Sequence, residues 1–197
     1  MRNLPVFLSL ICLFSINNLS GQSQIFKELQ QREKAGTIVQ KKIVKNLLSE
    51  EGAEQVGLSK DGNAIYFNID QPVIAEIIVH RPALLRVKIP SVSSGEELTL
   101  LLFNKKPFAE GAVVTTSAGD RHPMSGGAYY RGTVEGDEHS VVALSFMDGE
   151  MVGVVSVNNR QFDIGKVEHS DVHVIYDATK VNRKAPTGCE VKYVEGY

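Results

Sequence analysis

The sequence contains no tryptophan and only two cysteines, and these shortages narrow the range of functions. Aromatic residues make up 7% of the 197 residues and none of them is Trp, which excludes a carbohydrate-binding platform of exposed indole rings. The net charge is −2 and both signs are interspersed. This balance argues against a nucleic-acid partner, because proteins that bind nucleic acid present a basic face.

Motifs for self-contained catalysis are also missing. The sequence has no His-Glu-x-x-His pair of zinc ligands, no Gly-x-Ser-x-Gly turn that presents a nucleophilic serine, and no glycine-rich phosphate-binding loop. We therefore expect that the chain is not an enzyme and that it has no cofactor of its own.

The first 21 residues have the pattern of a signal peptide. Arg2 supplies the positive charge, and residues 6–16 form an apolar run that is too short to span a bilayer comfortably. Small residues follow at Ser20 and Gly21, and we place cleavage after Gly21; a signal anchor is the alternative, and a lipoprotein site fits less well. Cleavage leaves 176 residues, enough for one soluble, exported domain, secreted or periplasmic. It also removes Cys12, so Cys189 becomes the only thiol.

Residues 22–56 are expected to form an N-terminal helical segment. Ile25, Phe26 and Leu29 make a small apolar face among Gln, Lys and Glu residues. Gly36 separates this part from residues 38–48, whose apolar positions have amphipathic helical spacing, although a strand is possible for part of them.

Residues 57–178 are expected to form a β-rich domain. Short alternating segments recur with turn residues between them, and Asp148-Gly149 is a strong hairpin signal. The expected strands are residues 64–69, 84–89, 98–103, 112–116, 128–135, 140–146, 151–157, 161–164 and 172–176. Residues 72–79 are ambiguous between helix and strand. The predicted fold is mainly β (α+β at most), an antiparallel β-sandwich or open barrel, followed by a disordered tail over residues 179–197.

Several clusters could carry chemistry, and most have a plainer interpretation. His169 and His173 have the spacing that one helix face would present to zinc, but they flank a predicted strand, and ordinary polar positions are favoured. The acidic residues at 135, 137 and 138 are more simply a solvated turn than a Ca²⁺ or carboxylate site. Arg183 and Lys184 form a dibasic pair that a protease could process, or that serves solubility alone.

Cys189 is the candidate metal ligand. It follows Gly188 in the tail, where a flexible segment could reach a pocket on another domain. A thiolate is a strong zinc ligand and could fill the open coordination position that a zinc protease needs for water. The plainer interpretation is a tolerated surface thiol.

One set of segments occurs in a particular order along the chain. The segments are Tyr129-Tyr130-Arg131-Gly132-Thr133-Val134, Ser140-Val141-Val142-Ala143-Leu144-Ser145, Gly153, His173-Val174-Ile175-Tyr176 and Cys189. This order resembles the propeptide of reprolysin/adamalysin-type (ADAM-like) zinc metallopeptidases. That family has Tyr-x-Gly-x-Val, Ser-x-Val-x-Leu-Ser, a Gly-containing hairpin, His-x-Ile-Tyr and then a single cysteine. The resemblance covers roughly residues 60–190 and is closer to bacterial secreted members than to animal ones.

The resemblance implies a non-catalytic role. Propeptides of this family assist folding of the protease and keep it latent, and their lone cysteine is the proposed zinc ligand, so Cys189 would bind the zinc of a protease domain. Glu190 stands where the family often has Gly. The implied partner is a zinc metallopeptidase catalytic domain, in cis if the chain is a fragment and otherwise in trans. The alternative is a secreted β-sandwich module for adhesion or assembly, unrelated to proteolysis.

Overall fold

A computed structural model describes residues 24–49, 53, 63–92, 95–109, 111–115, 119–123 and 126–180. The helices are α1 (Gln24–Ala35) and α3 (Gln71–His80). The strands are β1 (Ile38–Lys41), β2 (Val44–Leu47), β3 (Ala64–Ile69), β4 (Leu84–Pro90), β5 (Glu97–Asn104), β6 (Val113–Thr115), β7 (Arg121–Pro123), β8 (Ala128–Val134), β9 (Asp137–Met147), β10 (Glu150–Val157), β11 (Arg160–Lys166) and β12 (Val172–Asp177). The mainly β fold is confirmed, and the nine strands expected between residues 64 and 176 are all present.

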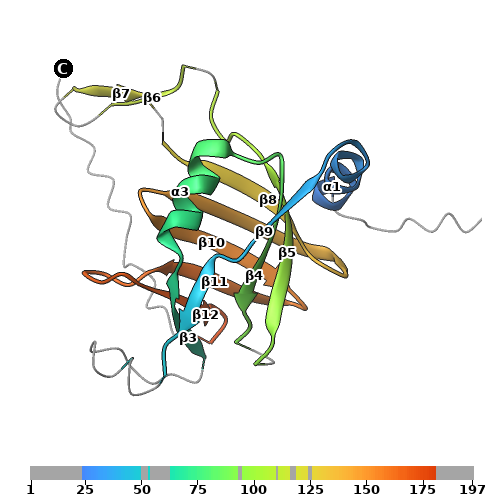
Figure 1. The fold of residues 1–197 in the computed structure, drawn as a ribbon, viewed down its shortest axis with the longest axis vertical. Coiled ribbons are helices and arrows are strands. Elements are labelled where there is room, and N and C mark those ends of the chain that lie inside the picture. Colours follow the sequence, from blue (N-terminus) through green and yellow to red (C-terminus); the bar gives the residue numbers. More distant parts are fainter. Residues whose placement is uncertain are drawn as a thin grey trace, which may run out of the picture.

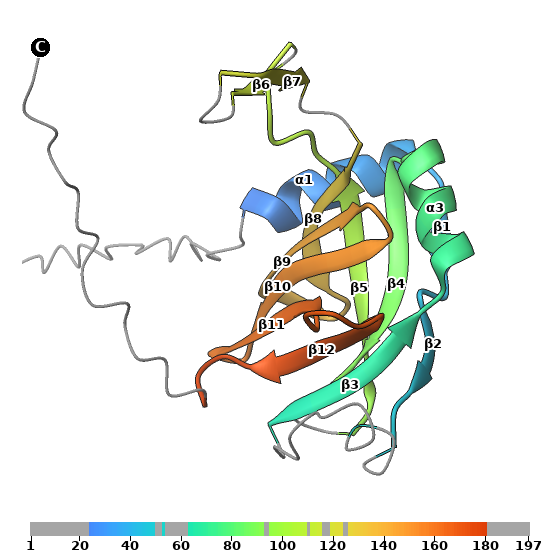
Figure 2. The same ribbon diagram turned by 90° about the vertical axis from the view of Figure 1, so that its left-hand side faces the viewer.

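Ten strands form a single curled sheet, so the architecture is an open barrel and not a sandwich (Figure 1, Figure 2). The strand order is β1-β4-β5-β8-β9-β10-β11-β12-β3-β2, and β6 pairs with β7 as a separate hairpin. Every neighbour pair in the large sheet is antiparallel except β1 with β4, which is parallel. β1 and β2 are consecutive in sequence but lie at opposite edges of the sheet. The chain therefore crosses from one edge to the other within two residues, Lys42 and Ile43.

The expectation of a helix over residues 38–48 is wrong, because these residues form β1 and β2. The apolar residues of this segment have a spacing that resembles a helix. The reason is that two short strands joined by a two-residue connection place apolar side chains at irregular intervals. Ile43 in the crossing is fully buried, and its carbonyl accepts the Asp70 N–H at 2.8 Å. The β-branched residues of this segment suit strands, and their pairing partners on β4 and β3 are far away in sequence.

The ambiguous segment 72–79 belongs to a helix, α3, which lies across the concave side of the sheet (Figure 1). Asp70 caps its N-terminus, with Oδ1 accepting the Val73 N–H at 3.3 Å, and Pro72 occupies the first turn, where a missing N–H costs nothing. The helix ends at Arg81, which has a left-handed conformation (φ 43°). Its apolar face buries Ile74 and Ile77.

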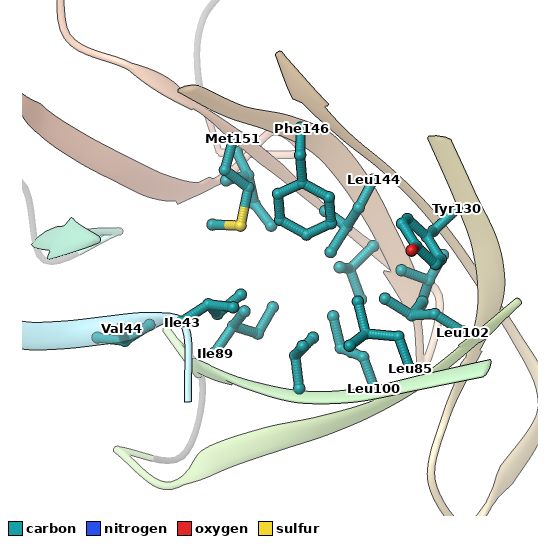
Figure 3. Close-up of a cluster of buried hydrophobic side chains, with 14 of the residues drawn as sticks. Ile43, Val44, Leu85, Ile89, Leu100, Leu102, Tyr130, Leu144, Phe146 and Met151 are labelled. Carbon is teal, nitrogen blue, oxygen red and sulfur yellow. The ribbon is translucent and has the colours of Figure 1, made fainter. Parts of the chain in front are cut away.

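The main core fills the concave side of the sheet. Figure 3 shows side chains from β4 and β5 meeting those from β8, β9 and β10 in the interior. A second, smaller cluster lies on the opposite face of β4 and β5, where Leu29 of α1 packs with Leu84 and Phe103. The Arg32 guanidinium lies 4.9 Å from the Phe103 ring centroid. Helix α1 therefore covers one part of the outer face.

Candidate functional site

An apolar patch lies on the outer face of β9 and β10, opposite the main core. Val141, Val152 and Val154 are 36%, 40% and 38% exposed. Val154 lies directly between Ala143 of β9 and Asp163 of β11, and Asp163 is paired with Tyr176 of β12. We call Val141, Ala143, Val152, Val154 and Tyr176 the outer patch. Alternate residues of a strand point to the same face, which places these side chains together.

The sequence of β10 explains why the patch exists. An antiparallel strand with one face in solvent normally alternates apolar and polar residues. In β10 the inward positions Met151 and Val155 are fully buried, yet the outward positions Val152 and Val154 are valines as well. Val141, Ala143, Val152 and Val154 adjoin one another, while Ser145, Ser156 and Asp163 stand at the paired positions beside them. An exposed apolar group on a sheet is the kind of surface that binds another protein. Tyr176 gives the patch a polar margin, since its hydroxyl donates to Asp163 Oδ2 at 3.3 Å.

The last described residues begin beside this patch and are firmly held. The Asp177 side chain has no exposed surface. Its Oδ2 accepts hydrogen bonds from Arg160 Nη2 at 2.6 Å and from Nε at 3.0 Å, and its Oδ1 accepts from Thr179 Oγ1 at 2.6 Å and from Thr179 N–H at 3.0 Å. The Arg160 guanidinium also lies 5.1 Å from the Phe162 ring centroid. These contacts fix the direction in which the chain leaves β12.

The environment of Asp177 keeps its carboxylate ionised. The hydrogen bond from the Thr179 hydroxyl and the bonds from Arg160 lower the pKa of Asp177 below its usual 3.8, although burial acts in the opposite direction. Cys189 lies nine residues after Lys180, the last described residue. Nine residues span at most about 30 Å when fully extended.

The polar residues that carry the resemblance have structural roles in the described part of the chain. The Tyr130 hydroxyl donates to the Pro82 carbonyl at 3.1 Å, and its ring packs edge-on against Phe146 at 5.8 Å. Burial raises the pKa of Tyr130 to about 12. Ser140 Oγ accepts the Val134 N–H at 2.7 Å and so holds the start of the β8–β9 hairpin together.

The two glycines of the resemblance allow neighbouring strands to approach closely. Gly132 is paired with Leu102 of β5, and a Cβ at Gly132 would overlap the Leu101 carbonyl oxygen. A Cβ at Gly153 would overlap the Ala143 carbonyl oxygen of β9 in the same way. The β8–β9 pairing also shifts register just after Gly132. Both glycines therefore permit the curling of the sheet.

The structure does not bring the candidate metal residues together. His169 lies in the turn before β12, with a positive φ of 56° and a side chain that is 91% exposed, whereas His173 is fully buried. The acidic turn of β8–β9 is likewise dispersed. Asp137 Oδ1 accepts two backbone N–H groups of its own turn, and Glu135 pairs with Arg86 at 2.7 Å. Among the described residues no group of three or more His, Cys, Asp or Glu side chains converges on one point.

Other predicted features lie outside the described residues. They are the signal peptide of residues 1–21 with Cys12, the dibasic pair Arg183 and Lys184, and Cys189. In the described ranges, neither helix is long and apolar enough to cross a membrane.

Sequence reasoning missed the outer patch. The available signal was the run Val152 to Val155, in which apolar residues do not alternate with polar ones except at Gly153. The run predicts a strand, but its exposed face cannot be identified from the sequence without the strand pairing.

Comparisons with known proteins do not assign the chain to a family. No family model matches it, and neither the curated proteins nor the solved structures contain a significant match.

Proposed function

We propose that this chain is a non-catalytic, propeptide-like domain of an exported zinc metallopeptidase, which assists folding of the protease and keeps it latent. The observation that carries the proposal is the position of the outer patch. It lies beside the end of β12, from which the chain continues toward Cys189. A catalytic domain bound on the patch would be within reach of the Cys189 thiol, because the chain from Lys180 to Cys189 spans up to ~30 Å when fully extended.

Two elements contribute to latency under this proposal. The outer patch supplies apolar area that becomes buried against the protease, at about 25 cal/mol per Å². The Cys189 thiolate supplies a ligand for the protease zinc, because sulfur is a preferred donor for this metal and a catalytic site keeps one position open. Neither element requires a metal bound by this chain alone.

The test is inhibition of a reprolysin-type zinc metallopeptidase catalytic domain by the purified chain without residues 1–21. Three variants separate the contributions. Cys189→Ala removes the thiol, Val154→Lys places a charge in the outer patch, and Val79→Lys is the matched control. Val79 is 73% exposed on α3, away from the patch. Circular dichroism of each variant checks that the fold is retained.

The expected result is that Cys189→Ala abolishes zinc-dependent inhibition. Val154→Lys should weaken inhibition at least about tenfold, equivalent to about 1.4 kcal/mol of binding, while Val79→Lys leaves it unchanged. Undiminished inhibition by Cys189→Ala would refute the role of the thiol. Equal effects of the two lysine variants would refute the patch as the docking surface. A wild-type chain that inhibits no such protease would favour the adhesion or assembly module.

A further inference from the structure

His173 is a fully buried histidine in the first half of β12. It is paired with Lys166 of β11 on one side and with Phe67 of β3 on the other. Its exposed fraction is 0%, and its ring centroid lies 6.0 Å from that of Phe67. The imidazole is therefore enclosed by the sheet and the core and is not in contact with solvent.

The imidazole also joins β12 to β10 across β11. Pairing between β10 and β11 ends at Gly153 and Ile164. The N–H of Met151, two residues beyond that end, donates to His173 Nε2 at 3.2 Å. Because Nε2 accepts this hydrogen bond, the neutral ring carries its proton on Nδ1. Nδ1 is buried and has no hydrogen-bond partner in the part of the chain that the structure describes.

Three charged side chains, Lys166, Glu150 and Asp171, act electrostatically on the ring. Lys166 of β11 forms ion pairs with Glu150 of β10 at 3.3 Å and with Asp171, in the turn before β12, at 3.5 Å. These three side chains line a solvent-open hollow of about 580 Å³. Burial is the largest influence on the pKa of His173 and lowers it. The Asp171 backbone, which can accept a hydrogen bond from the protonated ring, is the second-largest influence and raises the pKa. Lys166 lowers the pKa further, and the Glu150 and Asp171 carboxylates raise it.

Among the described residues, the other elements near the ring add no charge that acts on the pKa of His173. From β3 the neighbour is the Phe67 ring. Gln71 of α3 donates a hydrogen bond from its amide to the Gly149 carbonyl at 2.8 Å and so holds the turn before β10. Protonation of His173 is therefore opposed mainly by loss of solvent and by the neighbouring ammonium of Lys166.

We propose that His173 is an acid-sensitive latch that joins β10 to β12 while it is neutral and releases the start of β12 when it is protonated. Protonation converts Nε2 from an acceptor into a donor, which then faces the Met151 N–H, so that two donors oppose each other. It also places a cation in the core beside Lys166. The inference concerns the fold of this chain and holds whether or not the chain binds a metallopeptidase.

The direction of the pH effect follows from proton binding. In the unfolded chain His173 binds a proton near its usual pKa of 6.5, whereas in the folded chain it binds one only at lower pH. The stability that depends on the neutral ring is therefore fully present above pH 6.5 and is lost as the pH falls toward the folded pKa. Within that window the unfolding equilibrium constant rises by up to about tenfold per pH unit.

Denaturant unfolding between about pH 7.5 and about pH 5 tests the latch, because it measures how the unfolding equilibrium constant changes with pH. His173→Gln keeps an amide oxygen that can accept the Met151 N–H but cannot be protonated in this range. His139→Gln is the control, because that side chain is 67% exposed. We expect the unfolding equilibrium constant to rise with acid equally in the wild-type chain and in His139→Gln. In His173→Gln this rise should be smaller by up to about tenfold per pH unit. An unchanged rise in His173→Gln overturns the proposal.

A second measurement needs no variant. NMR titration of the imidazole nitrogens should show that His173 remains neutral at pH values below 6.5, the usual pKa of a histidine. Hydrogen-exchange protection of the Met151 amide should fall together with the protonation of His173. A His173 that is protonated at its usual pKa of 6.5, or a Met151 amide whose protection does not follow the protonation of His173, refutes the latch.

Discussion

Gly132→Ala should be among the most destabilising single-methyl substitutions in the β-domain. Gly132 of β8 is paired with Leu102 of β5. A Cβ at this position would overlap the carbonyl oxygen of Leu101 and would lie 2.8 Å and 2.9 Å from two further backbone atoms, Leu101 C and Leu102 Cα. These neighbours are backbone, so no side-chain rotation relieves the overlap. The two strands have to separate.

The cost can be estimated from two contributions. Inserting a methyl group where there is no room costs about 1–3 kcal/mol through displaced neighbours. Separating β5 from β8 weakens one or two hydrogen bonds between the strands, at about 1 kcal/mol each. We therefore expect a loss of about 4 kcal/mol, a large share of the 5–15 kcal/mol that is typical of the stability of a whole domain. For a chain of this size such a loss lowers Tm by about 12 °C.

Gly165→Ala is the matched control for this prediction. Gly165 also lies inside a strand, but a Cβ there would meet no atom within 4 Å, so its substitution should change stability by less than about 1 kcal/mol. Urea unfolding of both variants and the wild-type chain gives the comparison. Equal stability of the Gly132 and Gly165 variants would show that the close approach of β5 and β8 is not a constraint, and the account of the curled sheet would fail.

Two further predictions concern buried polar groups. Tyr130→Phe should cost about 1 kcal/mol, because the Pro82 carbonyl loses its 3.1 Å donor; a variant as stable as wild type in urea would contradict that role. Asp177→Asn should cost about 2 kcal/mol at neutral pH by weakening the bonds from Arg160 and Thr179. Since these bonds lower the folded pKa of Asp177 below 3.8, their stabilisation is present above that pH and disappears as the pH falls through the folded pKa. Asp177→Asn should lack this acid-dependent stabilisation. If the stability of the variant below pH 4.5 changed with pH as that of the wild-type chain does, the prediction would be wrong.

The sequence was sufficient to predict most strands because their signals are local. Alternation of apolar residues and hairpin turns such as Asp148-Gly149 act within a few residues, and β9, β10 and β11 follow them directly. Residues 38–48 had no such signal. β1 and β2 exist because they pair with β4 and β3, which are 20 or more residues away along the chain. Tertiary pairing decided the structure of that segment against its apparent helical period.

The candidate site was less predictable than the fold for a related reason. Whether a valine faces the core or solvent depends on strand register and on which face carries a helix. Val152 and Val155 are indistinguishable in sequence, yet one is 40% exposed and the other fully buried. The burial of His173 could not be predicted from the sequence either. Its partner Met151 lies 22 residues away, and the two residues are neighbours only because β11 lies between β10 and β12 in the sheet.

The roles of the shared residues also bear on what the resemblance can predict. Gly132, Gly153 and Ser140 act on strand spacing and hairpin closure, so a protein that shares them is expected to share the curled sheet whatever it binds. The positions that would distinguish a protease partner from another partner are Val154 on the outer face, which the resemblance does not include, and Cys189, which it does. Substitutions at Gly132, Gly153 and Ser140 therefore test the fold, and substitutions at Val154 and Cys189 test the proposed function.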